Sequence, residues 1–149
     1  DKEVKKVKAI VSKAKGAPVD LSGRLSLKQL ASLSRMALFF FGVDTAPMHI
    51  AAATNVKVIA IFGPSGSFNW GPWDNDWASS HKKTGLAPYP KRSGIQRFGR
   101  NIVIQDNRDC VPCGKDGCKG SKKSDCLDEL SPVLVWDIIA KELESDIRV

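Results

Sequence analysis

The sequence predicts an α/β fold, an open parallel sheet with helices on both faces, and three observations lead to this prediction. Residues 37–43 and 57–62 form two runs that are almost entirely apolar, not alternating. Continuous apolar runs of this length are typical of parallel strands that are buried on both faces. Helix signals precede the first run and separate the two, so residues 26–62 read helix, strand, helix, strand. The short connection between the strands favours a Rossmann-like arrangement.

The N-terminal segment is predicted to be an amphipathic helix. Within residues 2–14, lysines surround four apolar residues at helical spacing: Val4, Val7, Ile10 and Val11. Gly16 is a plausible end for this helix. Residues 19–21 are then expected to form a short strand.

Two further helices are expected around the first apolar run. Ser26 is placed to cap the second helix, whose apolar positions are Leu27, Leu30, Leu33 and Met36. Residues 44–47 are expected to open the third helix, which covers about residues 48–53.

The second half of the chain contains fewer periodic positions. Residues 64–100 hold three tryptophans among Gly, Pro and Ser, which predicts a long ordered loop with short turns. Residues 102–104 are expected to form a last strand, and a cysteine-rich loop covers residues 108–127. A C-terminal helix is predicted over residues 131–144, with Ser131 and Pro132 as its start.

Length and charge restrict the class of protein. The 149 residues, 42% hydrophobic and 26% charged, have a globular composition without an apolar run long enough to span a membrane. The net charge of +7 is concentrated in residues 1–15 and 81–126. Such a surface suits an acidic partner, such as a phosphorylated glycan, an anionic membrane or a nucleic acid, but it is equally an ordinary solvated surface.

The four cysteines lie within seventeen positions: Cys110, Cys113, Cys118 and Cys126. Thiolates on a tight loop can enclose a tetrahedral zinc ion, so a structural zinc site is one interpretation. Free thiols in a reducing compartment, or disulfides formed after purification, are the alternatives.

The turn after the first apolar run is the candidate ligand site. In open α/β sheets ligands bind beyond the carboxyl ends of the strands, and free N–H groups at a helix N-terminus attract anions. Thr45 and Ala46 are therefore expected to donate N–H groups to a phosphate, while Asp44 accepts hydrogen bonds from sugar hydroxyls. The alternative is purely structural: Asp44 or Thr45 caps the helix, and His49 is a core histidine bonded to a carbonyl.

Four segments carry a family resemblance. They begin with Leu-Ser-Gly-Arg-Leu-Ser-Leu at 21–27, continue with Phe-Gly-Val-Asp-Thr-Ala-Pro-Met-His at 41–49, and end with Ile-Phe-Gly-Pro-Ser at 61–65 and Trp-Gly-Pro-Trp at 70–73. In this order they resemble the ADP-heptose:lipopolysaccharide heptosyltransferases of glycosyltransferase family 9. The cysteine segment that ends in Asp125-Cys126-Leu127 is similar to a segment found in many members of this family.

The resemblance implies a GT-B enzyme with two Rossmann-like domains, of which residues 1–149 are part of the C-terminal, nucleotide-sugar-binding domain. The first strand of that domain and the acceptor domain, which carries the proposed catalytic base, are expected to be missing. We therefore expect a fragment without transferase activity of its own, and its catalytic residues stay unknown. The opening residue, Asp1, is not a methionine, which agrees with a fragment.

The resemblance also implies roles for single residues. Asp44 would contact the heptose hydroxyls, and Thr45 and Ala46 would contact the diphosphate. His49 would lie near the phosphates or support the turn. Leu25 would pack against adenine. Family members often have Gly where this chain has Ala46. The implied reaction transfers heptose from ADP-heptose to an inner-core heptose of lipopolysaccharide, with inversion and without a required cofactor.

Two other functions stay open at this stage. One is a GT-B transferase that uses another nucleotide sugar. The other is a basic zinc-knuckle module that binds nucleic acid, although no recognisable nucleic-acid-reading motif supports it and no nucleic acid is expected. A heptosyltransferase would be cytoplasmic, and a peripheral position at the inner-membrane face is an option because basic loops would meet an acidic acceptor and anionic lipids there.

Overall fold

The computed structural model describes residues 2–81 and 87–147, and a four-stranded sheet forms its centre. The strands lie in the order β1-β2-β4-β3. Their bounds are β1 (Phe39–Val43), β2 (Lys57–Phe62), β3 (Gln96–Phe98) and β4 (Asn101–Gln105). The first three in this order run parallel, whereas β3 pairs antiparallel with β4. The sequence prediction of a parallel open sheet is thus confirmed.

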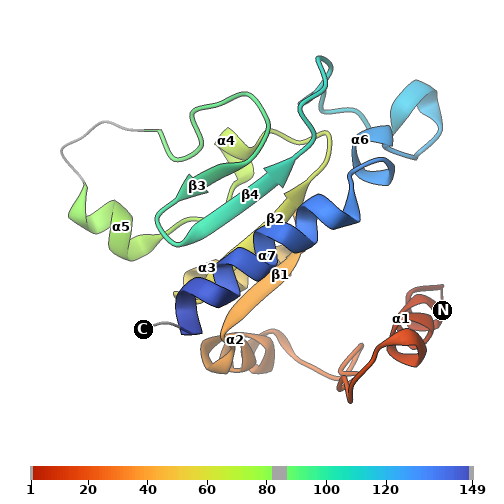
Figure 1. The fold of residues 1–149 in the computed structure, drawn as a ribbon, viewed down its shortest axis with the longest axis vertical. Coiled ribbons are helices and arrows are strands. Elements are labelled where there is room, and N and C mark those ends of the chain that lie inside the picture. Colours follow the sequence, from red (N-terminus) through yellow and green to blue (C-terminus); the bar gives the residue numbers. More distant parts are fainter. Residues whose placement is uncertain (1, 82–86, 148–149) are drawn as a thin grey trace.

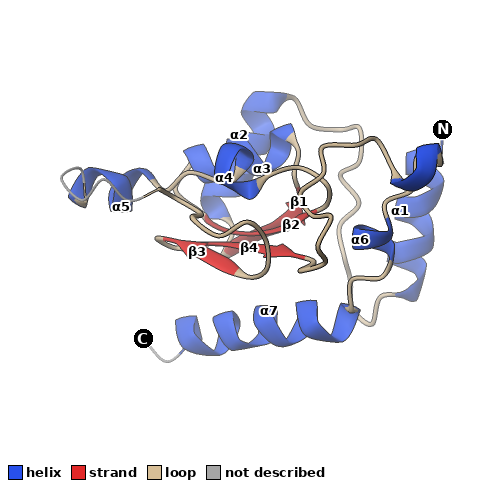
Figure 2. Cartoon of the chain, turned by 90° about the horizontal axis from the view of Figure 1, so that it is seen from above, coloured by secondary structure: helices blue, strands red, loops and turns tan. Residues whose placement is uncertain are grey.

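Helices cover both faces of the sheet (Figure 2). One face carries α2 (Leu27–Met36), α3 (Ala46–Ala53) and the short α4 (Ser67–Trp70), and α7 (Pro132–Ile147) crosses the other. This three-layer arrangement is the α/β architecture expected for a partial Rossmann-like domain.

Alternation along β2 divides the core into two halves. Val58, Ala60 and Phe62 pack with Met48 and Ala51 of α3. Ile59 points the other way and packs with Ile102 and Ile104 of β4 and with α7 through Val135 and Ile139. Because each Å² of buried apolar area contributes about 25 cal/mol, both helical layers stabilise β2.

The N-terminal part is attached more loosely than the sequence predicts. Helix α1 (Lys2–Lys13) forms as expected but lies apart from the sheet in both views (Figures 1 and 2). Residues 19–21 are not a strand, so this prediction is wrong. A strand needs a hydrogen-bonded neighbour, and no strand of the described chain lies beside these residues.

Strand β1 is less buried than its sequence predicts. It begins at Phe39 rather than at residue 37, and it is an edge strand. Phe41 is 44% exposed and Val43 is 47% exposed, so burial on both faces is the wrong prediction here. Helix α7 covers the part of the sheet around β2 and β4 and leaves one face of β1 open. The apolar side of α2 is similarly exposed at Leu27 and Met36.

The segment 64–100 contains more regular structure than a loop. It includes α4, α5 (Asn75–Ser80) and β3. An aromatic cluster holds it: Trp73, Trp77 and Tyr89 surround Phe98 with ring centroids 5.1, 4.7 and 5.8 Å away. Such pairs each add about 1 kcal/mol beyond area burial.

The remaining elements lie near the C-terminus. The cysteine-rich loop contains a 3₁₀ turn, η1 (Cys118–Gly120), and a single helical turn, α6 (Asp125–Asp128), and α7 extends beyond its expected end at residue 144. The basic residues Lys82 and Lys83 lie outside the described residues. Among the described helices, none is both long and apolar enough to cross a membrane.

One buried carboxylate joins the 64–100 segment to the sheet. Asp74 is 4% exposed and accepts hydrogen bonds from the N–H groups of Trp77 and Arg100, at 2.9 and 2.8 Å. The Arg100 side chain adds an ion pair to Asp74. Burial alone would raise the pKa of Asp74, but these hydrogen bonds and the Arg100 charge outweigh it and lower the pKa.

We predict that Asp74→Ala lowers the free energy of unfolding by about 3 kcal/mol at pH 7, because two N–H groups and Arg100 lose their partner. Because folding lowers the pKa of Asp74, its contribution is fully present above its unfolded value near 3.8 and is lost as the pH falls further. Urea denaturation at pH 7 and pH 3 measures both effects.

The matched control is Asp76→Ala. Asp76 also pairs with Arg100, but its side chain is 60% exposed, so the loss should be below about 1 kcal/mol at either pH. Equal destabilisation by the two substitutions would contradict the role given to Asp74.

Candidate functional site

The candidate turn lies at the carboxyl end of β1, where Asp44 continues the sheet. Its N–H group donates to the carbonyl of Ile61 at 3.2 Å. Its carboxylate Oδ2 accepts a hydrogen bond from the hydroxyl of Ser65 at 2.6 Å. Asp44 is half-buried and Thr45, Ala46 and His49 are exposed, so the turn is open to a ligand.

The N-terminus of α3 presents free amide groups. Thr45 is its N-cap in an extended conformation, but no side chain caps the helix. The Thr45 hydroxyl donates back to the carbonyl of Val43 at 3.2 Å. Within the described chain the N–H groups of Thr45 and Ala46 have no acceptor, and Pro47 has no N–H group. Thr45 therefore occupies the N-cap position, but neither its side chain nor that of Asp44 caps the helix by a hydrogen bond, and the geometry can hold an anion.

The other two predicted residues lie further along the chain. His49 is exposed in the first turns of α3, so it is not a core histidine. Leu25 is half-buried just before α2, which packs beside α3.

Ser65 belongs to the site but was absent from the sequence prediction. The hydroxyl reaches Asp44 because β1 and β2 are parallel neighbours, so the segments that follow them meet at one edge of the sheet. The third strand, β4, ends there too with Gln105. The signal in the sequence was the run Gly63-Pro64-Ser65 directly after a buried strand.

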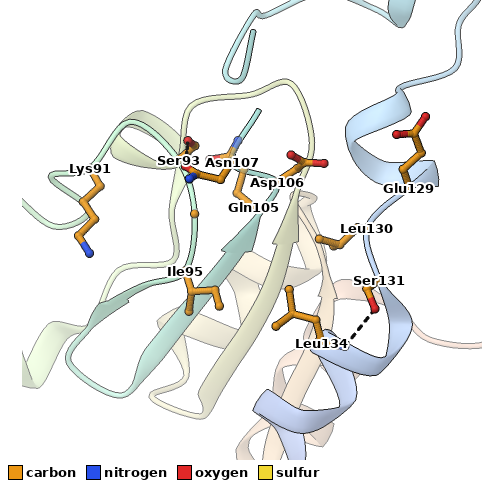
Figure 3. A pocket seen from close by; sticks show the side chains of 11 residues that line it. Lys91, Ser93, Ile95, Gln105, Asp106, Asn107, Glu129, Leu130, Ser131 and Leu134 are labelled. Carbon is orange, nitrogen blue, oxygen red and sulfur yellow. Dashed lines mark hydrogen bonds between the residues drawn. The ribbon is translucent and has the colours of Figure 1, made fainter. Parts of the chain in front are cut away.

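Two hollows lie near this edge, and neither is lined by Asp44, Ser65 or the N-terminal residues of α3, although Gln105 lines the first. One, of about 540 Å³, opens between the end of β4 and the start of α7, with Lys91, Asp106 and Glu129 at its wall (Figure 3). Arg108 forms hydrogen bonds with both acids, and its bonds to Asp106 lower the pKa of that carboxyl. The second, of about 490 Å³, is apolar and adjoins Val43.

An Asp-x-Asp sequence, Asp74-Asn75-Asp76, is present but lies at the opposite end of the sheet. Both carboxylates pair with Arg100, whose guanidinium also donates to the carbonyl of Asn55, just before β2. A pair of acids already neutralised by an arginine is a structural link and not a free cation site.

The cysteines are all unbridged. Cys110 and Cys113 are exposed, Cys118 is half-buried and Cys126 is buried. The N–H group of Asp125 donates to the Cys118 sulfur at 3.4 Å. In residues 2–81 and 87–147, no three His, Cys, Asp or Glu side chains are arranged to hold a metal ion. The structure gives the zinc interpretation no support, and it stays a prediction.

Comparison with known proteins identifies the family. The family model of glycosyltransferase family 9 (heptosyltransferase) matches residues 1–96, nearly two thirds of the chain. The chain belongs to glycosyltransferase family 9. This family match includes the Asp44 turn and Ser65, and it ends within the segment that precedes β4.

Curated relatives of family 9 agree with this assignment. The chain is 39% identical over 95 residues to lipopolysaccharide heptosyltransferase 3 of Escherichia coli K12, which covers 61% of the chain and 26% of that protein. It is 25% identical over 122 residues to lipooligosaccharide heptosyltransferase 2 of Campylobacter jejuni. This match covers 82% of the chain and 31% of that protein. The chain thus spans less than a third of these relatives. No solved structure matches it significantly.

We predict that the four thiols differ in reactivity. Cys110 and Cys113 should react first with an alkylating reagent, and Cys126 last, because burial raises the pKa of its thiol and the neighbouring Cys118 adds to the effect. Mass spectrometry of protein alkylated for increasing times measures the order. If zinc is bound, the exposed pair should instead be protected until a chelator is added, and elemental analysis of fresh protein gives the metal content.

Proposed function

We propose that the chain is the donor-binding part of a lipopolysaccharide core heptosyltransferase that uses ADP-heptose. The observation that carries this proposal is the turn Asp44–Ala46, where a carboxylate lies at the end of β1 beside two N–H groups that have no acceptor among residues 2–81 and 87–147. A sugar diphosphate has the matching chemistry, since its phosphates accept hydrogen bonds and its hydroxyls donate them. The names of the curated relatives favour heptose as the sugar.

In this proposal the N-terminus of α3 acts on the leaving group. A heptose hydroxyl of the acceptor attacks the anomeric carbon with inversion, and the bond to the diphosphate breaks. Negative charge then grows on ADP, and the N–H groups of Thr45 and Ala46 stabilise it. Each well-placed donor in such a site lowers the barrier by roughly 3 kcal/mol. Asp44 holds the sugar, and His49 lies close enough in sequence to support the turn.

The rest of the enzyme completes the reaction. We place the acceptor site and the catalytic base in the N-terminal domain, so the 149 residues alone bind the donor without transferring it. Leu25 packs against the adenine in the assembled site. The enzyme acts in the cytoplasm at the inner-membrane face, where Lys91 and Arg92 on the exposed segment before β3 attract the acidic acceptor or anionic lipids.

A transferase for another nucleotide sugar is the second candidate, because the helix N-terminus recognises a diphosphate and not a base. Calorimetry of the full-length protein with ADP, UDP and GDP separates the two. We expect ADP to bind at least tenfold more tightly than the others, and equal or better binding of UDP or GDP would favour the second candidate.

We predict that Asp44→Asn in the full-length protein lowers kcat/KM for ADP-heptose by about 10- to 100-fold, as expected for losing a charged hydrogen-bond acceptor. The thermal midpoint should change by less than a few degrees, because Asp44 is half-buried on an open turn. Steady-state kinetics and thermal denaturation measure both. Turnover close to that of the unchanged enzyme would contradict the role of Asp44.

We also predict that Ala46→Pro weakens ADP binding by about tenfold. Position 46 is the first residue of α3, where proline is well tolerated, and Thr45 before it is already extended. The substitution therefore removes one N–H group and little else. Ala46→Ser is the control that keeps the N–H group, and it should bind ADP within about twofold of the unchanged protein. Unaltered ADP binding by the proline variant would contradict phosphate binding at this helix.

A further inference from the structure

We infer that Ser65 and Gln105 are positioning residues that fix the Asp44 carboxylate for its sugar ligand. The inference rests on the proposed function of Asp44. It begins with the bond from the Ser65 hydroxyl to Asp44 Oδ2, which at 2.6 Å is a short, charge-assisted hydrogen bond. Both side chains are half-buried, so water competes with this bond only in part.

The bond leaves one carboxylate oxygen for a ligand. Oδ2 is engaged from the side of the sheet, and Oδ1 has no hydrogen-bond donor within the described chain. An aspartate held by one oxygen keeps a single orientation of its carboxylate plane. A sugar hydroxyl then meets an acceptor that is already in place, so less side-chain freedom is lost on binding.

Ser65 is itself held by a buried amide. Gln105, 3% exposed at the end of β4, donates through Nε2 to the carbonyls of Gly63 and Ser65 at 2.7 and 2.8 Å. The carbonyl between them, that of Pro64, accepts from the N–H group of Gly114 at 2.8 Å. All three carbonyls of the turn Gly63–Ser65 are therefore bonded from outside, which fixes the turn that carries the Ser65 hydroxyl.

Packing alone does not explain why a glutamine occupies position 105. Its Oε1 atom is buried without a hydrogen-bond partner in the described chain. An unpaired buried acceptor lowers stability, and an apolar side chain of similar length would avoid it. The two bonds donated by Nε2 are what an apolar side chain could not provide, and both go to the turn beside Asp44.

The decisive comparison is Ser65→Thr with Ser65→Val in the full-length protein. The two side chains have nearly the same shape, and only threonine keeps the hydroxyl. We expect the valine variant to bind ADP-heptose about tenfold more weakly, while its affinity for ADP, which lacks the sugar, stays within twofold. The threonine variant should bind both like the unchanged protein. Gln105→Met should weaken ADP-heptose binding about threefold and, like Ser65→Val, leave ADP binding within twofold.

Asn101→Leu controls for general destabilisation. Asn101 is a buried amide on the same strand, but it bonds Val58 and Pro72 at the opposite end of β4. Its replacement should lower the thermal midpoint and leave the ratio of the two affinities unchanged. In an Asp44→Asn background, Ser65→Val should have no further effect on that ratio, since its target is already removed.

The outcomes separate this inference from the proposed function. If Asp44→Asn weakens ADP-heptose binding but Ser65→Val does not, the positioning role is wrong and the proposed function stands. If Ser65→Val weakens ADP and ADP-heptose equally, Ser65 has only a structural role and the inference fails. If Asp44→Asn itself leaves ADP-heptose binding unchanged, the proposed function fails together with the inference.

Discussion

The parallel pairing of β1, β2 and β4 is the constraint on which the rest of the structure depends. Parallel strands cannot be joined by tight hairpins, so each connection must cross a face of the sheet. The connections therefore supply the covering layers, with α3 between β1 and β2. The same pairing places the ends of all three strands at one edge. Asp44, Ser65 and Gln105, which are far apart in the sequence, meet there for that reason.

Elements with a local signal were predictable from the sequence. Ser26 forms the full capping box with Gln29, and β2 has the predicted bounds because its apolar run is bordered by Asn55 and Gly63. The helix that follows Asp44 also starts near its expected position. In each case the residues that determine the element are its own neighbours in the chain.

Features that depend on distant partners were not predictable. The exposed face of β1 follows from where α7 crosses the sheet, and the missing strand at residues 19–21 follows from the lack of a neighbour. The tryptophans predicted that the 64–100 segment is ordered, but not that it forms α4, α5 and β3, whose arrangement depends on aromatic contacts with Phe98. The site shows the same division. The position of Asp44, Thr45 and Ala46 between a strand and a helix could be predicted from local spacing, whereas the hydrogen bonds of Ser65 and Gln105 join segments that are distant in the sequence.

The turn after β2 also approaches the cysteine-rich loop closely. A Cβ atom at Gly63 would lie 2.8 Å from Cδ1 of Leu127, in α6. A larger residue at position 63 would therefore displace the Leu127 side chain, which is 39% exposed. The turn that carries Ser65 thus packs directly against a loop whose own sequence reveals no such neighbour.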